Sequence, residues 1–360
     1  MSSMSSIPRT LLQHTHVGTQ AKQILSSRAS LLSGLDTNAG CLFLGGLNIS
    51  TAAEVYTLLQ PLLNPMEYMG GTNDRQSLAS NGGVLDAGTE PSHLHVAEHC
   101  EMLYLDTFPS IIVFACLENA KFGGNTTVVS TDAVEQALPT SFVAKLQRLG
   151  VQHRMCYGNE GVKTWEAAFG TEDTRTVEEY VGKHEGWTLE WGDIGEKGTP
   201  TSVTVSFARA SYTQHPRNLS NSTEAHHVRN DEGSVFLSQT DLSGKWYDSW
   251  EPHCRLPFDK RPYSFRWGDG SEFSAEEMDA WGEAKERELK EVDWTAGSDL
   301  LILDNLRTMH GRLPYEGGQR RMAVMLGDPV SRVLEEGGGG GSSGGDWWFD
   351  EVTVPGESSL

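Results

Sequence analysis

Short apolar runs separated by turn-forming residues recur along the chain and predict a protein built mainly of β-strands. The clearest runs lie at residues 40–47, 111–116, 299–305 and 317–326. Short apolar runs bounded by Gly, Pro, Asn or Asp are typical of buried strands. The organised pattern stops after the last run, so we expect the folded core to end near Arg332.

Capped or amphipathic segments between these runs predict flanking helices. They cover residues 21–35, 51–63, 132–138 and 274–292. The last one begins with Ser274-Ala275-Glu276-Glu277, which resembles a capping box, and continues with apolar residues near helical spacing. The pattern therefore indicates a mainly β fold with flanking helices.

The chain divides into segments of different composition. Residues 1–18 are expected to form a flexible N-terminal arm, and residues 19–335 a single domain. Within that domain, residues 139–260 carry short β-like runs among polar stretches, which is typical of a lid or a substrate-selecting insertion. The Gly- and Ser-rich residues 336–345 predict a linker, and residues 346–360 form an acidic and aromatic tail.

Charge and composition narrow the classes of partner. The 360 residues carry a formal net charge of −21, which argues against polyanionic partners such as nucleic acid or an anionic membrane surface. The chain contains no apolar run of about 18 residues, so we expect no membrane span. A small molecule is the expected partner.

Cysteine use and the N-terminal composition bear on the compartment. The five Cys residues are scattered without a CxxC pair, which predicts free thiols in a reducing compartment and hence a cytoplasmic protein. The first 35 residues contain no Asp or Glu and are rich in Ser. This composition leaves an organellar transit peptide as the alternative.

The candidate chemistry centres on His99-Cys100-Glu101. On an extended strand, residues two apart point to the same side, so His99 and Glu101 can reach one metal ion while Cys100 faces away. A third ligand must come from elsewhere, and His310, just past the strand at 299–305, is the candidate. Two His and one carboxylate form the facial triad of non-haem Fe(II) oxygenases, which keeps coordination sites open for a co-substrate and dioxygen.

A second pair of histidines competes with this assignment. His93 and His95 also stand two residues apart, and such a pair binds a metal as readily as His99 and Glu101. Strand spacing alone leaves both pairs open.

Three further motifs accompany His99-x-Glu101. A Gly-Gly turn, Gly123-Gly124-Asn125-Thr126-Thr127, lies beside a strand, Asp304-Asn305 precedes His310, and Arg321 follows that histidine by eleven residues. In this order and spacing, the motifs resemble those of the TauD/TfdA family of Fe(II)/2-oxoglutarate-dependent dioxygenases, in particular its SyrP-like and clavaminate-synthase-like branch.

The resemblance implies a double-stranded β-helix, that is, a jelly-roll or cupin-like core with the metal inside one end of the barrel. It implies Fe(II), 2-oxoglutarate and O2 as cofactors. It also implies His99, Glu101 and His310 as iron ligands, and thereby favours this set over His93 and His95.

The same resemblance assigns the far carboxylate of 2-oxoglutarate to Arg321 and a hydrogen bond with this cofactor to Thr126. A guanidinium suits this role because it binds a carboxylate through two parallel hydrogen bonds. Arg320 is the rival, since neighbours on a strand face opposite ways, but Arg321 is preferred. Candidates for binding a substrate carboxylate, with a structural role as the alternative for each, are Arg75, Arg307 and Arg312.

The reaction implied is oxidation of an unactivated C–H bond of a small amino-acid-like specialised metabolite, with release of succinate and CO2. Hydroxylation, desaturation and oxidative cyclisation, such as a kainoid-type ring closure, all remain open. Met325 stands where taurine dioxygenase has a further Arg, which disfavours taurine, and the retained Glu101 disfavours halogenation. Two alternatives are an inactive cupin-like binding module and a metal-dependent hydrolase, because the same ligands also make a zinc site.

Overall fold

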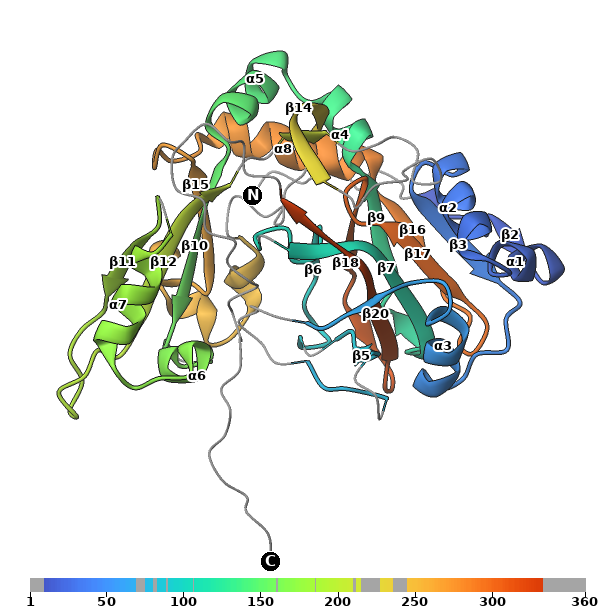
Figure 1. Cartoon of the computed structure of the whole chain (residues 1–360), viewed down its shortest axis with the longest axis horizontal. Helices are drawn as coiled ribbons and strands as arrows, with labels where there is room; N and C mark the ends of the chain where they lie inside the picture. The colour runs from blue at the N-terminus through green and yellow to red at the C-terminus, as the bar shows by residue number, and fades with distance from the viewer. Residues whose placement is uncertain are drawn as a thin grey trace, which may run out of the picture.

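The fold is given by a computed structural model (Figure 1). It describes residues 10–68, 75–79, 83–88, 90–105, 107–159, 161–184, 186–209, 212–214, 227–235 and 245–332. Strands predominate in this part of the chain and helices flank them, as the apolar pattern predicts. The expected linker at 336–345 and the tail at 346–360 lie outside the described residues.

A nine-stranded sheet forms the main body of the molecule. The order of its strands is β13 (Tyr212–Gln214), β14 (His227–Val235), β20 (Arg321–Arg332), β7 (Thr107–Glu118), β17 (Leu300–Asp304), β3 (Cys41–Gly45) and β2 (His16–Val17), while β4 (Pro65–Met66) and β5 (Leu85–Asp86) pair with β20. Its antiparallel centre, β20–β7–β17–β3, coincides with the four apolar runs of the sequence.

A five-stranded sheet carries the metal-site motifs. Its order is β1 (Thr10–Leu11), β16 (Lys290–Val292), β9 (Thr126–Ser130), β18 (Thr308–Arg312) and β6 (Val96–His99). Strand β18 lies between β9 and β6 and is antiparallel to both. Residues from the middle and the end of the chain therefore become neighbours in one sheet.

Alternation along the central strands builds two separate cores. On β7, Ile112 and Phe114 pack in one cluster with Val128 of the five-stranded sheet. The intervening Ile111 and Val113 belong to a second cluster, which includes apolar residues of the N-terminal helices. Because successive strand residues point to opposite faces, the nine-stranded sheet is covered by the five-stranded sheet on one face and by helices on the other.

The expected insertion forms much of a third sheet. The four strands, in order, are β11 (Thr188–Trp191), β12 (Val203–Arg209), β10 (Val151–Tyr157) and β15 (Tyr263–Trp267). The short 3-10 helices before β15 are η2 (Lys245–Ser249), η3 (His253–Arg255) and η4 (Phe258–Lys260). A two-stranded sheet pairs β8 (Phe122–Gly123) with β19 (Tyr315–Glu316) and joins the Gly-Gly turn to the segment after His310.

The helices begin near the caps that the sequence indicates. Their bounds are α1 (Thr19–Ile24), α2 (Arg28–Thr37), α3 (Ala52–Leu59), α4 (Thr131–Ala137), α5 (Thr140–Leu149), α6 (Trp165–Phe169), α7 (Thr174–Gly182) and α8 (Ala275–Glu288). Ser274 and Glu277 form the expected capping box of α8, and Thr51 and Glu54 form another at α3. The helix expected at 21–35 is divided in two, because Ser27 caps a new helix through the Ser30 N–H.

The N-terminal arm expected at 1–18 is anchored over its described part. Strand β1 pairs in parallel with β16, and β2 pairs in parallel with β3. The side chain of His14 lies 3.1 Å from the buried carboxylate of Asp299 and stacks on Phe43. The expectation of a flexible arm is therefore wrong for residues 10–18, because backbone pairing holds them on both sheets.

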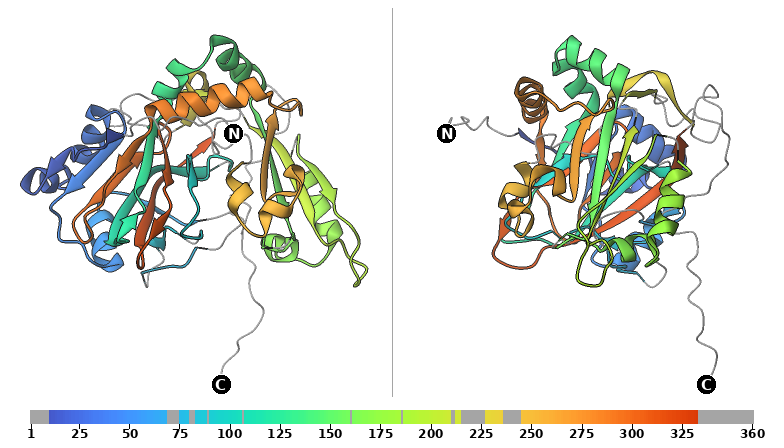
Figure 2. Two further views of the ribbon diagram at one scale, coloured as in Figure 1. Left: turned by 180° about the vertical axis from the view of Figure 1, so that it is seen from behind. Right: turned by 90° about the vertical axis from the view of Figure 1, so that its left-hand side faces the viewer.

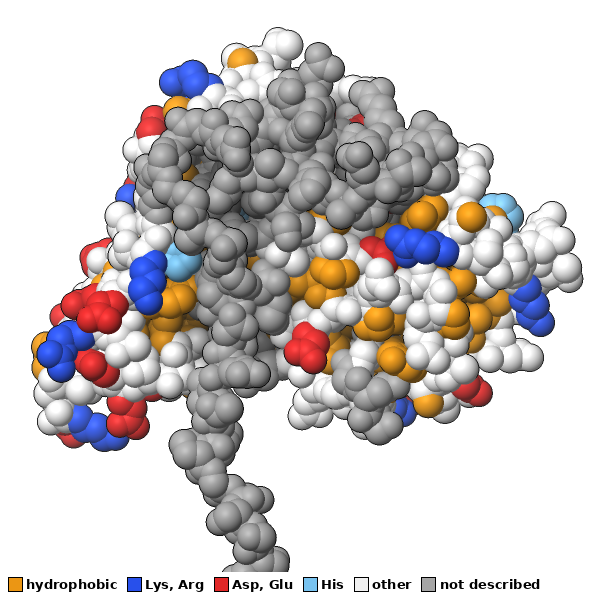
Figure 3. Space-filling view, in the orientation of Figure 1, with side chains coloured by type: hydrophobic (Ala, Val, Ile, Leu, Met, Phe, Trp, Pro, Cys, Tyr) orange, Lys and Arg blue, Asp and Glu red, His pale blue; other side chains and the backbone are white. Residues whose placement is uncertain are grey.

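The molecule has two lobes (Figure 1). The nine- and five-stranded sheets with α1, α2 and α3 form one lobe, the four-stranded sheet with α6 and α7 forms the other, and α8 spans the top of both, as the view from behind also shows (Figure 2). On the face in Figure 3, acidic and basic side chains lie close together around α7, whereas hydrophobic ones gather over β20 and α3. Within the described residues, no helix has the length and apolar character needed to cross a membrane.

Candidate metal centre

His99, Glu101 and His310 meet at the β6 edge of the five-stranded sheet. His99 ends β6, Glu101 lies in the turn that follows it, and His310 lies on β18. His310 pairs directly with His99 across the antiparallel strands. The register of β18 on β6 thus brings together residues that are more than two hundred positions apart.

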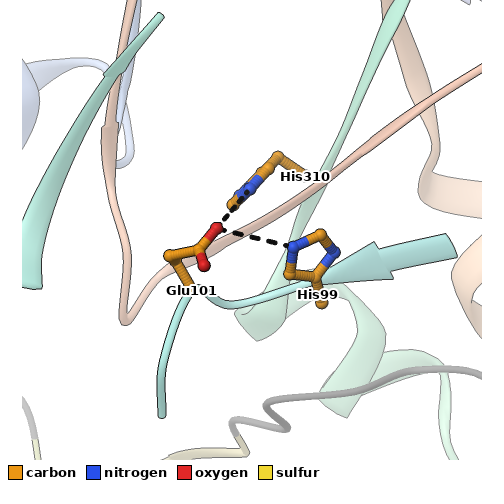
Figure 4. Close-up of side chains that lie close together, drawn as sticks. All are labelled: His99, Glu101 and His310. Atoms are coloured by element: carbon orange, nitrogen blue, oxygen red, sulfur yellow. Dashed lines mark ion pairs between the residues drawn. The ribbon is translucent and has the colours of Figure 1, made fainter. Parts of the chain in front are cut away.

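The three side chains point toward one another (Figure 4). Glu101 Oε2 lies 3.7 Å from Nε2 of His99 and 3.7 Å from Nε2 of His310. The three atoms offered as ligands all lie within 4.8 Å of one another, and this is the one group of His, Cys, Asp or Glu in the described part of the chain with that spacing. Two nitrogens and one oxygen in this arrangement fit one face of a non-haem iron ion.

Burial and neighbouring charges keep two of these groups in the forms that bind metals. Burial alone would raise the pKa of Glu101, but Arg75 and the two histidines outweigh it and hold that pKa well below its usual value. Burial, together with His99, lowers the pKa of His310 to about 4. An ionised carboxylate and a neutral imidazole are the protonation states that metal binding requires.

Asn305 fixes the backbone that carries Glu101. Its side-chain oxygen accepts a hydrogen bond from the Glu101 N–H at 2.8 Å, and its amide donates to the Glu101 carbonyl at 2.9 Å and to the Pro109 carbonyl at 2.7 Å. Asn305 is completely buried, where such bonds hold a single geometry. The Asp304-Asn305 motif drew attention to this residue, but the sequence did not indicate that it clamps Glu101.

The triad lines a cavity of about 1120 Å³, including the open space at its mouth. The wall draws on all three main sheets, with Phe114 on β7 of the nine-stranded sheet, Thr126 on β9 of the five-stranded sheet and Tyr263 on β15 of the four-stranded sheet. The ring centroids of Phe114 and His310 lie 4.9 Å apart. The cavity wall therefore combines apolar and aromatic side chains with charged groups, among them the triad and three arginines.

Arg320 and Arg321 face opposite ways at the start of β20. Arg320 lines the cavity, and its Nε donates to the Gly124 carbonyl at 2.9 Å. Arg321 is exposed and is not part of the cavity lining. Met322, the residue after Arg321, also lines the cavity, and the strand register shifts between these two residues. The prediction that Arg321 lies in the site is therefore wrong, and the alternative, Arg320, lines the cavity.

Thr126 lies beside Arg320, as a shared cofactor role would require. It is buried on β9 and lines the cavity. Its Oγ1 accepts hydrogen bonds from Trp294 Nε1 at 2.9 Å and from Arg320 Nη2 at 3.4 Å. The sequence pattern identified Thr126 but missed Trp294, whose contact depends on the pairing of β16 with β9.

The three arginines expected at the substrate have different surroundings. Arg75 lines the cavity, and its Nη2 donates to Glu101 Oε2 at 3.0 Å. Arg312 also lines the cavity, but its Nη2 donates to the carbonyls of Pro91 and Leu94. Arg307 is half-buried and lies outside the cavity lining, so the expectation of a substrate contact there is wrong.

The competing histidine pair stays apart from the triad. His93 is exposed, and His95 Nε2 lies 2.9 Å from Glu98 Oε1. The fully buried Glu98 also accepts a hydrogen bond from Thr127 at 2.8 Å and pairs with Lys285 Nζ of α8 at 2.8 Å. His95 therefore belongs to a polar network behind β6, which holds the strand that carries His99.

The expected insertion supplies an aromatic wall of the cavity. Trp246, Tyr247, Trp250 and His253 line it from the segment 245–255. Their rings pack on one another, with centroids 5.4 Å apart for Trp246 and Trp250 and 5.4 Å apart for Tyr247 and His253. The sequence shows this aromatic density, but only the folded chain brings it to the triad.

Comparisons with known proteins cover most of the chain. The model of the family described as "Taurine catabolism dioxygenase TauD, TfdA family" matches residues 15–326. The dapdiamide synthesis protein DdaC of Enterobacter agglomerans is 26% identical over 302 residues, which are 82% of this chain and 84% of that protein. A clavaminate synthase-like protein of Arabidopsis thaliana is 24% identical over 311 residues, 84% of this chain and 86% of that protein.

Solved structures of similar outline include PvcB. The crystal structure of PvcB from Pseudomonas aeruginosa has a TM-score of 0.45 and 18% identity, with 85% of this chain and 80% of that chain covered. A structure of PvcB, described as an Fe, alpha-ketoglutarate dependent oxygenase from an isonitrile synthetic pathway, has a TM-score of 0.47 and 16% identity, with 91% and 90% covered.

Proposed function

The chain belongs to the TauD/TfdA family of non-haem Fe(II)/2-oxoglutarate-dependent dioxygenases, and we propose that His99, Glu101 and His310 hold its iron. The observation that carries this proposal is the meeting of their three ligand atoms within 4.8 Å. Two imidazoles and a carboxylate on one side of the ion leave its other positions open for 2-oxoglutarate and O2.

We assign the far carboxylate of 2-oxoglutarate to Arg320, with Thr126 beside it. Arg320 is a largely buried guanidinium that lines the same cavity as the triad. The parallel N–H donors of a guanidinium suit the two oxygens of a carboxylate. The hydrogen bond to the Gly124 carbonyl orients the guanidinium of Arg320. The Gly-Gly turn would thus serve as the support of the cofactor arginine.

We further propose that the nine- and five-stranded sheets form the double-stranded β-helix of this family, with the insertion at 139–260 as its lid. The shared core of the two sheets supports the first part. The residues that 245–255 adds to the cavity wall support the second.

The proposed reaction is oxidation of an unactivated C–H bond of a small amino-acid-like specialised metabolite. Bound Fe(II) with 2-oxoglutarate and O2 supplies the oxidising power, and succinate and CO2 are released. The chain's own residues position both molecules and keep water out through an apolar wall that includes Phe114 and Met322. Placement of the substrate in this wall would decide between hydroxylation, desaturation and cyclisation.

Two observations support this class of substrate over the alternatives. The name of the relative DdaC connects that protein with dapdiamide synthesis, which is a role in specialised metabolism. In a metal-dependent hydrolase, by contrast, Arg320 and Thr126 beside the triad would have no purpose. An inactive binding module would need neither these residues nor the triad.

The assignment of the iron ligands is tested by anaerobic titration of the protein with Fe(II) in the presence of 2-oxoglutarate. The visible charge-transfer band of the iron–2-oxoglutarate complex is expected in the wild type. Loss of a residue that supports a metal ligand lowers metal affinity by roughly 10- to 100-fold. Because His310 is proposed as a ligand itself, His310→Ala should lower the affinity for iron by more than that. Glu101→Ala should abolish succinate release.

The matched control is His93→Ala, which removes an exposed imidazole of the competing pair. It should leave the band and iron affinity unchanged. Undiminished iron binding in His310→Ala, or turnover to succinate in Glu101→Ala, would contradict the assignment.

A further inference from the structure

The cavity wall carries arginines in two settings. Arg312 and Arg320 line it with Thr126, and they lie close enough that Arg312 contributes, after burial, to lowering the pKa of Arg320 to about 10. Arg75 lines it beside Glu101 of the triad. Because 2-oxoglutarate has one carboxylate far from the iron and Arg320 is assigned to it, Arg75 is left for another molecule.

The guanidinium of Arg75 is held in place with one donor unused. Nη2 donates to Glu101 Oε2 at 3.0 Å, and the guanidinium carbon lies 4.6 Å from the centre of the Tyr68 ring, so two contacts hold the group in position. Nη1 is buried and has no hydrogen-bond partner among the described residues. Buried donors without an acceptor are rare in folded proteins, so an acceptor supplied by a ligand is expected at Nη1.

Arg312 is less suited to this task. Its Nε, like Nη1 of Arg75, is buried without a hydrogen-bond partner among the described residues. Its Nη2, however, is already shared between the carbonyls of Pro91 and Leu94, and its guanidinium carbon lies 5.1 Å from the centre of the Tyr315 ring. These contacts join the strand of His310 to the segment before β6. Arg312 is therefore best explained as a structural support that adds positive charge near Arg320.

The charge balance of the cavity leaves one positive charge unmatched. Among the described residues, the charged side chains that line it are three cations and two anions: Arg75, Arg312, Arg320, Glu90 and Glu101. Fe(II) and the dianion of 2-oxoglutarate cancel each other. A low-dielectric site with one surplus cation favours a ligand that carries one negative charge.

The remaining wall suits an apolar group. Trp246 and Trp250 of the insertion and Tyr263 of β15 all line the cavity. Flat aromatic side chains of this kind bind apolar and aromatic groups over a large area.

We propose that the substrate is an organic acid that places its carboxylate on Arg75 and packs an apolar or aromatic remainder against Trp246 and Trp250. This inference rests on the proposed function, since it concerns the same cavity. Because Arg75 contacts the ligand residue Glu101, the carbon atoms next to the carboxylate lie closest to the metal site and are the ones exposed to oxidation.

The test uses three probes of one shape and different charge: phenylpropanoate, phenylpropanamide and phenylpropylammonium. Each is titrated anaerobically into the enzyme loaded with Fe(II) and 2-oxoglutarate, and binding is followed by the change in the visible charge-transfer band and by calorimetry. The acid should bind about tenfold or more tightly than the amide, because a hydrogen bond to a charged group is stronger than one to a neutral group. The ammonium should bind most weakly.

Two variants locate the carboxylate. Arg75→Gln should bring the affinity for the acid down to that for the amide, and Arg75→Lys, which keeps the charge, should retain part of the preference for the acid. The matched control Arg307→Gln changes an arginine outside the cavity lining and should leave all three affinities unchanged. Trp250→Leu should weaken the acid and the amide by the same factor.

Equal affinity for acid and amide, tighter binding of the ammonium, or no binding of any probe would overturn the inference. These outcomes leave the proposed function standing. Absence of the band in the wild-type protein would instead remove the proposed function itself.

Discussion

The surroundings of Arg320 define what it can bind. Burial and the neighbouring Arg312 lower its pKa to about 10, which still leaves it charged at neutral pH. Its hydrogen bonds go to the neutral acceptors Gly124 and Thr126. A buried cation with neutral partners is stabilised by an anion, and 2-oxoglutarate supplies one in this family.

Arg320→Ala should therefore raise the KM for 2-oxoglutarate by about 10- to 100-fold, because a hydrogen bond to a charged group contributes about 1.5–3 kcal/mol. Arg321→Ala removes the same group from the exposed side of β20 and should leave that KM unchanged. Steady-state measurement of succinate formation against 2-oxoglutarate concentration checks both. A rise confined to Arg321→Ala would reverse the assignment.

Helix α8 forms an ion pair near each of its two ends, one with the five-stranded sheet and one with α5. Near its C-terminal end, Lys285 pairs with the completely buried Glu98 of β6 at 2.8 Å. Near its N-terminal end, Glu277 pairs with the partly exposed Lys145 of α5 at 2.7 Å. The first pair is enclosed and the second is open to solvent, so the same change should have unequal effects on stability.

Lys285→Met would leave the carboxylate of Glu98 buried without its cation. Burial alone raises the pKa of Glu98, and Lys285 is the main group that reverses this effect and brings the pKa well below its usual value. Removing one partner of a buried ion pair costs about 3–5 kcal/mol. Chemical denaturation should therefore show a decrease of that size in the free energy of unfolding. Since Glu98 precedes His99, iron affinity should fall as well.

Lys145→Met is the matched control, because it removes the cation of the other ion pair that α8 forms. Partly exposed pairs contribute about 1 kcal/mol or less, and iron affinity should not change. Equal losses of stability in Lys145→Met and Lys285→Met would show that burial does not distinguish the two pairs.

At the scale of the whole molecule, the cavity is the place where the three main sheets meet. Its wall takes Phe114 from the nine-stranded sheet, His310 from the five-stranded sheet and Tyr263 from the four-stranded sheet. A ligand that binds there contacts the folded state only, because unfolding separates these residues. Binding must therefore stabilise the entire fold.

Mn(II) with 2-oxoglutarate, which forms the complex without turnover, should raise the melting temperature. A ligand at one hundred times its Kd adds about 2.7 kcal/mol to the free energy of unfolding, which corresponds to several degrees for a protein of this size. Differential scanning fluorimetry measures the shift. An equal rise of the melting temperature in His99→Ala would show that the metal does not bind at the triad.

Several features of this protein follow from its sequence alone. The apolar runs identified β7, β17, β20 and β3 because buried strands need continuous apolar residues. The capping box at Ser274 marked the start of α8 because its hydrogen bonds are local. The clustering of His99, Glu101 and His310 was predicted because their motif keeps a spacing and order that resemble those of a family.

Other features were decided only when the strands paired. The side of β20 that faces the cavity depends on its packing, and a shift of one residue exchanges Arg320 for Arg321. The clamp of Asn305 on Glu101 and the contact of Arg75 with Glu101 join residues far apart in the chain. Local periodicity contains no information about which distant segments become neighbours, so these contacts exist only in the tertiary structure.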